Sequence, residues 1–205
     1  MKRVLMVRWD AKIGDSIVSS FFFRELRRFR PKIQIDVITA PHMASLYQEH
    51  FGVDHVYCCK KRPSYGELKE LAHEVGDTDL VIHLGKQLKM KDIYFLRCLN
   101  ADHVMGMDDE LDLVNIKLGR ATRGRHFSEK FAYALSLLGI SSPDCHYIIP
   151  EDGIRRQLMR QEWPKGPVVA LKPYGSGSSR RLNFDNVSML VELIGKCKPA
   201  WKVCL

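Results

Sequence analysis

Two carboxylates, a lysine and a glycine stand close together immediately after the first apolar segment of the sequence. They are Asp10, Lys12, Gly14 and Asp15, in the stretch VRWDAKIGDS at residues 7–16. The apolar residues before them are typical of a buried strand, and the residues after them are typical of a long helix. At such a corner the first N–H groups of the helix are free and carry partial positive charge, so anions and polar ligands bind there. The stretch therefore predicts a ligand site.

Asp15 has two interpretations. As a general base it would remove a proton from a bound hydroxyl group. As the N-cap of the helix it would stabilise the fold by about 1 kcal/mol. Gly14, before it, permits either a positive φ angle or the close approach of a ligand to the backbone. The residue types alone leave both pairs of alternatives open.

A second candidate site lies in the stretch ALKPYGSGSSRRLNFDNVSMLVELI, residues 170–194. An apolar strand is followed there by small residues, then by cations, and then by a helix. Backbone amides, positive side chains and a helix N-terminus together suit a diphosphate. The stretch is neither a Walker A loop nor a complete G-x-G-x-x-G fingerprint, and a solvated loop is the alternative. The candidate ligand-binding residues are Gly175, Ser176, Arg180 and Arg181.

Strand-like and helix-like segments alternate from the start of the chain, which predicts an α/β fold with a parallel sheet and helices on both faces. On the first helix, over residues 16–30, we expect Phe21, Phe22, Leu26 and Phe29 to form the buried stripe, with the arginines outward. The polar stretch 107–125 has no clear period and predicts a loop. His83, at the end of a strand, is expected to have a structural role rather than to bind a ligand.

The pattern changes near residue 150, where a charged helical segment is followed by WPKGP, residues 163–167. Two prolines and a glycine interrupt regular structure, which is typical of a linker. A new strand, loop, helix and strand follow. We therefore expect one domain over 1–150, a linker helix and hinge over 151–166, and the start of a second, incomplete Rossmann-like domain over 167–205.

Composition narrows the class of protein. The 205 residues carry a formal net charge of +8, which favours an anionic partner, but no helix-turn-helix, zinc-finger or RNP pattern indicates nucleic acid. No apolar run approaches the roughly 20 residues that span a bilayer, so we expect a cytoplasmic protein. The six cysteines are scattered and expected to be reduced. The histidines lack metal-site spacing, and no metal site is expected.

The segment RVLMVRWDAKIGDSIVSSFFFRELRRFRPKIQIDVITAP, residues 3–41, resembles the amino-terminal signature of the ADP-heptose:lipopolysaccharide heptosyltransferases, glycosyltransferase family 9. The family's Gly-Asp pair falls on Gly14 and Asp15. The resemblance implies that Asp15 is the catalytic base, which deprotonates the acceptor sugar. It also implies that Arg8, Asp10, Lys12 and Gly14 line the substrate site.

The second stretch is similar to the start of the donor domain in the same family. The resemblance implies that Gly175, Ser176 and Arg180 bind the donor phosphates, next to Arg181. It further implies a GT-B architecture, with an acceptor domain over 1–150, and inverting transfer of a heptose from ADP-heptose to the lipopolysaccharide inner core of bacteria. The implied partners are the nucleotide-sugar donor and a lipid-linked phosphorylated oligosaccharide, met at the cytoplasmic face of the inner membrane, with no metal or other cofactor.

Members of this family continue well past the point that corresponds to Leu205, with further βα units around the nucleotide. We therefore expect a truncated homologue whose transfer activity is impaired unless another polypeptide completes it. The alternative is a non-catalytic remnant that binds a nucleotide or a lipid acceptor.

Overall fold

The computed structural model describes residues 1–9, 12–173 and 181–205 of the chain. These residues form two compact units, Met1–Pro150 and Glu151–Leu205, which are described separately. The assignment of acceptor and donor roles to them stays a prediction.

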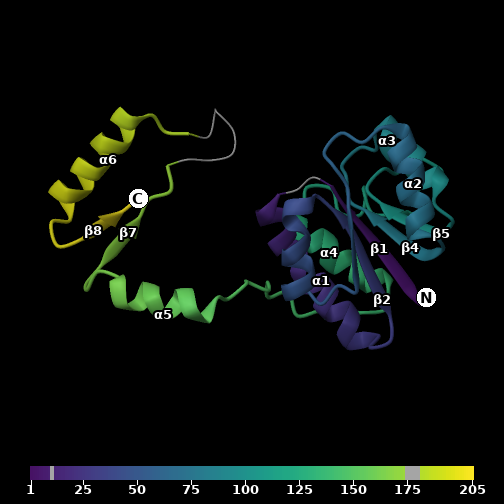
Figure 1. Ribbon diagram of the computed structural model, residues 1–205, viewed down its shortest axis with the longest axis horizontal. Helices are drawn as coiled ribbons and strands as arrows, with labels where there is room; N and C mark the ends of the chain where they lie inside the picture. The colour runs from purple at the N-terminus through teal and green to yellow at the C-terminus, as the bar shows by residue number, and fades with distance from the viewer. Residues whose placement is uncertain (10–11, 174–180) are drawn as a thin grey trace. The chain divides into compact units, whose positions relative to one another are not determined.

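The first unit is built on a parallel sheet (Figure 1). Six strands lie in the order β3-β2-β1-β4-β5-β6, and every pair is parallel. Because both faces are covered by helices, the central strands read as continuous apolar runs. The expected α/β sheet is confirmed. The strands are β1 (Arg3–Arg8), β2 (Gln34–Thr39), β3 (His55–Cys58), β4 (Thr78–His83), β5 (Ala101–Gly106) and β6 (Ile116–Lys117).

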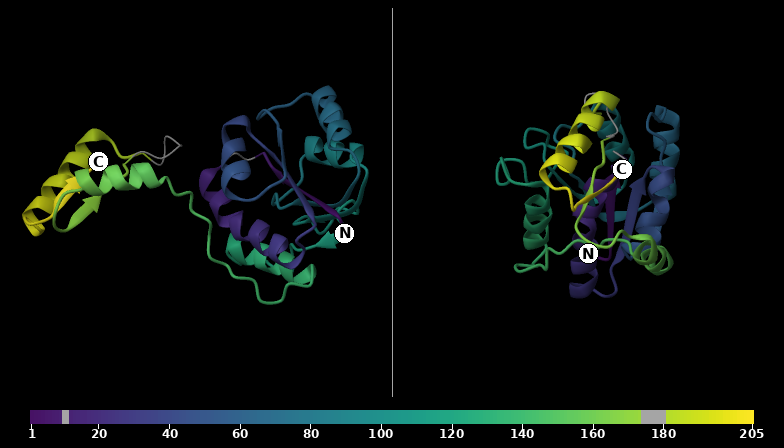
Figure 2. Two further views of the ribbon diagram at one scale, coloured as in Figure 1. Left: turned by 60° about the horizontal axis from the view of Figure 1, so that its bottom comes forward. Right: turned by 90° about the vertical axis from the view of Figure 1, so that its left-hand side faces the viewer.

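Helices cover the two faces of this sheet, as the two views in Figure 2 also show. On one face lie α1 (Ile13–Phe29) and α4 (Phe127–Leu137), together with a 3-10 turn (Pro41–Met43) and a π-helical turn, η2 (Leu46–His50). On the other face lie α2 (Tyr65–Val75) and α3 (Met90–Cys98). Each helix places an apolar stripe against the strands, which is the arrangement that buries both faces.

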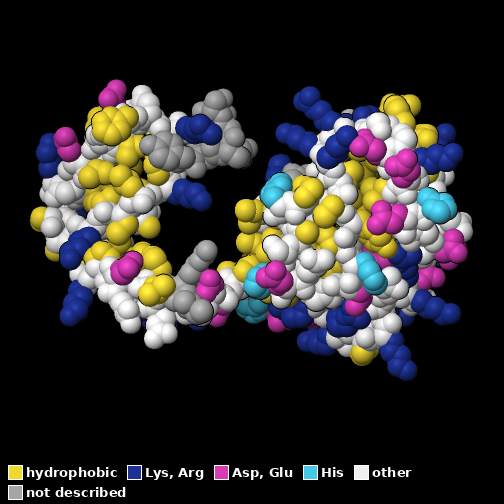
Figure 3. Space-filling model, viewed as in Figure 1, with side chains coloured by type: hydrophobic (Ala, Val, Ile, Leu, Met, Phe, Trp, Pro, Cys, Tyr) yellow, Lys and Arg dark blue, Asp and Glu magenta, His cyan; other side chains and the backbone are white. Residues whose placement is uncertain are grey.

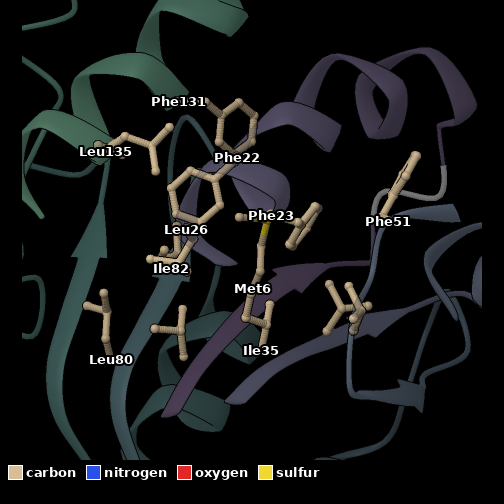
Figure 4. Packing of buried hydrophobic residues seen from close by; sticks show 14 of the residues in the cluster. Met6, Phe22, Phe23, Leu26, Ile35, Phe51, Leu80, Ile82, Phe131 and Leu135 are labelled. Atoms are coloured by element: carbon tan, nitrogen blue, oxygen red, sulfur yellow. The ribbon is translucent and has the colours of Figure 1, made fainter. Parts of the chain in front are cut away.

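The core beneath α1 is rich in aromatic side chains (Figure 4). Phe21, Phe22 and Leu26 are fully buried, as expected, and each contributes about 1.5–3 kcal/mol through burial. Phe23 is buried as well, at 1% exposure. Phe29 was expected in the stripe but is 50% exposed, because α1 ends at this residue and the chain turns away at once.

The segment 107–125 is not entirely a loop. Ile116 and Lys117 form β6, which pairs with the end of β5. The amide oxygen of Asn115 accepts a 2.9 Å hydrogen bond from the backbone N–H of Val104, and so aligns the two segments. The prediction missed β6 because a two-residue strand has no detectable alternation.

The second unit contains a short helix and one βαβ motif. Strands β7 and β8 are parallel neighbours, and α6 connects them. Large apolar side chains of α6 remain exposed, among them Phe184 at 77% and Met189 at 65%. The elements are α5 (Gly153–Glu162), β7 (Val168–Ala170), α6 (Phe184–Cys197) and β8 (Lys202–Cys204).

Two further expectations concern the whole chain. None of the six cysteines, all of which lie in the described ranges, takes part in a disulfide. No helix within the described ranges is both long and apolar enough to span a membrane.

Candidate functional site

The strand order reverses between β1 and β4. β1 pairs with β2 on one side and with β4 on the other, so the connections that leave these two strands run to opposite faces of the sheet. In open α/β sheets, ligands bind at the carboxyl ends of the strands at such a switch point. Here these ends are followed by the β1–α1 loop, which precedes Asp15, and by the β4–α3 loop, residues 84–89.

Asp15 lies in the first turn of α1 but is not its N-cap. The helix begins at Ile13, and its N-cap is Lys12, whose backbone is extended at φ −104° and ψ 116°. The N-cap interpretation of Asp15 is therefore wrong: the helix starts earlier than the apolar pattern indicates. The side chain of Asp15 is 41% exposed, and its Oδ2 lies 3.8 Å from Lys12 Nζ. This leaves a solvent-accessible carboxylate beside the free N–H groups of the first turn.

Gly14 adopts a helical conformation rather than a left-handed one, since the glycines with positive φ lie elsewhere in the described chain. One of the two alternatives for this glycine is thereby excluded. A Cβ atom added at Gly14 would meet no described atom within 4 Å. Close approach of a ligand to the backbone at Gly14 stays a prediction.

The other residues predicted at this corner are placed differently. Arg8 is only 5% exposed, and its guanidinium carbon lies 5.4 Å from the centroid of the Phe127 ring. Most of its surface is thus covered by the core, and its role in substrate binding stays a prediction. Lys12, by contrast, has 71% of its side chain exposed. Asp10 lies outside the described residues.

Three side chains that meet beside this corner were not predicted as a group. Oδ1 of Asp92, on α3, lies 3.1 Å from Nε1 of Trp9 and 3.3 Å from Nε2 of His83. Burial by itself would raise the pKa of Asp92, but the hydrogen bonds from His83, the Lys89 backbone N–H and Trp9 outweigh it and lower the pKa. The carboxylate is therefore held in its charged form. The position of His83 at the end of a strand was the one feature of the sequence that pointed to this group of side chains.

Cations gather on the loops at the same edge of the sheet, and Figure 3 shows Lys and Arg side chains together at the top of the first unit, beside α3. Of these, Lys60 is neutralised by Glu67, at 2.6 Å. The remaining cations are available to an anionic ligand. The exposed cations are Lys60, Lys61 and Arg62 after β3, and Lys86 and Lys89 after β4. Their sequence signal was the cluster KKR at residues 60–62.

The second candidate site is described only at its borders. Gly175, Ser176 and Arg180 lie outside the described residues, whereas Arg181 is described and exposed. The backbone N–H of Leu182 donates a 3.0 Å hydrogen bond to the carbonyl of Pro173. Next to it, Asn183 is the N-cap of α6, where its side chain accepts a 2.8 Å hydrogen bond from the backbone N–H of Asn186. The strand and the helix expected on either side of this stretch are present as β7 and α6.

Comparisons with known proteins bear on the fold. No family model matches the sequence, and a search of curated proteins gives no match either. Solved structures do match. The glycosyltransferase family 9 protein of Veillonella parvula DSM 2008 has a TM-score of 0.69 at 16% identity, over 98% of this chain and 62% of that one.

Two Escherichia coli structures match in the same way. Heptosyltransferase WaaC with ADP-2-deoxy-2-fluoro heptose has a TM-score of 0.62, over 99% of this chain and 76% of that one, at 16% identity. ADP-heptose lipopolysaccharide heptosyltransferase II has a TM-score of 0.61, over 99% of this chain and 63% of that one, also at 16% identity. The present chain thus spans 62–76% of the length of the three structures. The resemblance indicated by the sequence is confirmed at the level of the fold: the chain is similar to the GT-B heptosyltransferases.

Proposed function

We propose that the chain acts in the transfer of a heptose from ADP-heptose to a phosphorylated, lipid-linked oligosaccharide of the lipopolysaccharide inner core. The observation that carries the proposal is the position of Asp15, an accessible carboxylate in the first turn of α1 at the switch point of the sheet. Its environment suits a general base that receives a proton from a bound hydroxyl group.

The proposed reaction is one inverting displacement. Asp15 removes the proton of the acceptor hydroxyl, and the oxygen forms a bond to the anomeric carbon of the heptose. The bond from that carbon to the β-phosphate oxygen breaks, and ADP leaves with the electron pair. Arg180, Arg181 and the backbone amides near Gly175 and Ser176 would stabilise the negative charge of ADP, with no metal ion required. A solved neighbour, WaaC, holds an ADP-heptose analogue, which supports the choice of donor.

The cations at the carboxyl edge of the sheet support the choice of acceptor. Lys61, Arg62, Lys86 and Lys89 are exposed there, on the loops beside the switch point. Cations at this position favour a phosphorylated acceptor, and they would also draw the first unit toward an anionic membrane surface. We therefore include peripheral contact with the cytoplasmic face of the inner membrane in the proposal.

A second candidate function is acceptor or nucleotide binding without transfer. The two units differ in a way that favours it: the first has a six-stranded sheet, whereas the described part of the second has a two-stranded one with an exposed apolar helix face. A protein of this kind would bind the lipid-linked sugar through the first unit.

The test uses the full chain with ADP-heptose and a lipid-linked inner-core acceptor, and the transferred sugar is detected by mass spectrometry. We expect Asp15→Asn to reduce the transfer rate about 10²–10⁴-fold, the range for loss of a general base, without a change in melting temperature. Glu70→Gln, at an exposed acidic residue of α2, is the matched control and should keep the wild-type rate. An active Asp15→Asn variant would overturn the role of the base.

Calorimetry separates the two candidate functions. Binding of ADP and of an inner-core fragment, together with transfer, supports the enzyme. Binding of the fragment with no transfer by the wild-type chain supports the binding protein. If neither ligand binds, both functions are refuted.

A further inference from the structure

A buried polar network adjoins the loop that precedes Asp15. Oδ1 of Asp92 is shared by two donors, Nε1 of Trp9 at 3.1 Å and Nε2 of His83 at 3.3 Å. Oδ2 of the same carboxylate accepts a 2.8 Å hydrogen bond from the backbone N–H of Lys89. The side chains of His83 and Asp92 are 7% and 15% exposed. Residues from the ends of β1 and β4 and from the start of α3 are thus joined through one carboxylate.

The hydrogen bonds fix the protonation pattern of His83. The backbone N–H of Gly85 points to Nδ1 at 3.2 Å, so this nitrogen is the acceptor, and Nε2 carries the proton that is donated to Asp92. Both ring nitrogens are therefore occupied by the protein itself. Because the ring is also buried and both its nitrogens contact groups of the protein, we assign His83 a positional role.

Gly85 is required for this arrangement. A Cβ atom at this position would lie 2.7 Å from Cε1 of His83, closer than van der Waals contact allows. The β4–α3 loop thus fits the imidazole only with glycine here.

The network also holds the indole of Trp9 in place. Its ring meets Phe95 edge-on, with centroids 5.1 Å apart at 67°, and meets His83 with centroids 6.0 Å apart at 69°. Trp9 directly follows β1 and is the last described residue before the loop. The hydrogen bond to Asp92 and the two ring contacts thus hold the side chain that directly follows β1.

We infer that Trp9, His83 and Asp92 form a positioning network that fixes the chain where β1 ends, so that α1 begins in the place where the Asp15 carboxylate meets the acceptor hydroxyl. The expected effect of the network on turnover rests on the proposed function. Its expected effect on the structure does not. Misplacement of a reacting group by 1 Å can reduce a rate by about 10²-fold, so a network of this kind would affect turnover without touching substrate.

The experiment compares Trp9→Phe with the wild-type chain. This variant keeps an aromatic ring but removes the indole N–H, while His83 still donates to Asp92. Amide hydrogen exchange should accelerate about tenfold at Ser16 and Ile17, the first hydrogen-bonded amides of α1, as expected for loss of one net hydrogen bond, and stay unchanged in α4. Trp201→Phe, in the second unit, is the matched control and should alter neither segment.

Gly85→Ala provides a second variant that leaves all three network side chains in the sequence. It should accelerate exchange in the same residues by displacing His83. Unchanged exchange at Ser16 and Ile17 in both variants would overturn the network. An equal acceleration in α4 would also overturn it, because the effect would then be a general loss of stability.

The transfer assay gives the catalytic readout. Trp9→Phe should reduce kcat about 10- to 100-fold, with little change in the KM for ADP-heptose, because the donor site is not altered. A change in KM with kcat unchanged would contradict positioning of Asp15. If the wild-type chain shows no transfer, the proposed function fails, while the exchange experiment still decides whether the network fixes the start of α1.

Discussion

The hydroxyl of Tyr47 donates a 2.9 Å hydrogen bond to the hydroxyl of Ser16. Both residues are buried, at 0% and 2% exposure, and Ser16 directly follows Asp15. The ring of Tyr47 is itself enclosed, with Phe23 and Phe51 at centroid distances of 5.8 and 5.3 Å. The first turn of α1 is therefore tied to the aromatic core beneath the helix.

Tyr47→Phe should destabilise the first unit by about 1–3 kcal/mol, because the buried hydroxyl of Ser16 loses its donor. Urea unfolding measures this when Trp163 and Trp201 are both replaced by Phe, so that fluorescence reports on Trp9. Tyr65→Phe is the control: this residue is 46% exposed, and its variant should unfold within about 0.5 kcal/mol of wild type. Equal stability of Tyr47→Phe and the control would contradict a structural role for the bond.

Gly14 and Gly66 allow a matched comparison, because each is the second residue of a helix, α1 and α2 respectively. A Cβ atom at either would find space, with Ser64 Oγ at 3.9 Å as the nearest atom to the one on Gly66. Alanine at either position should therefore raise the free energy of unfolding by up to about 1 kcal/mol. Only Gly14→Ala should weaken binding of the inner-core fragment in calorimetry. Unchanged affinity would show that no ligand approaches the backbone at Gly14.

Much of the fold could be predicted because its information is local. Strand and helix alternation is encoded in short apolar runs, and the stop signals around residues 163–167 are proline and glycine. The start of α1 could not be located, because Ile13 is 60% exposed and adds nothing to an apolar face. That error of three residues made Asp15 look like an N-cap.

The network at the sheet edge could not be predicted for a different reason. Trp9, His83 and Asp92 come from three separate segments, and only the pairing of β1 with β4 brings them together. His83 was correctly expected to be structural, but its partners depend on long-range contacts that have no local pattern. Packing against Phe127, which buries Arg8, is a long-range contact of the same kind and could not be predicted from the sequence.

Arg3 and Asp36 form a buried ion pair. Replacing Arg3 alone should destabilise the fold more than replacing both residues. Arg3 Nε donates to Oδ2 of Asp36 at 2.7 Å, and Asp36 is fully buried between neighbouring strands. Arg3→Met should cost about 3–5 kcal/mol, because it leaves a buried carboxylate without its main counter-charge. The double variant Arg3→Met/Asp36→Leu should recover most of this loss in the same urea assay. A double variant no more stable than Arg3→Met would show that the charge is not the cause.

Glu67 gives a prediction for pH dependence near the cations that follow β3. The hydrogen bond with Lys60, followed by those from the backbone N–H and hydroxyl of Ser64, lowers the pKa of Glu67 from 4.5 to about 2. Between these values the unfolded chain binds the proton more readily than the folded one, so the stability of the fold rises with pH across this window. The stabilisation by Glu67 is therefore complete above pH 4.5 and is lost as the pH falls toward about 2.

Urea unfolding of wild type and Glu67→Gln at pH 6 and at pH 3 measures this effect. The neutral amide does not titrate, so wild type should be the more stable protein at pH 6, and the difference should shrink at pH 3. Glu70→Gln, one turn further along α2 at an exposed residue, should show no such change with pH. A difference between wild type and Glu67→Gln that stays constant from pH 6 to pH 3 would mean that the carboxylate of Glu67 is not held in its charged form by Lys60 and Ser64.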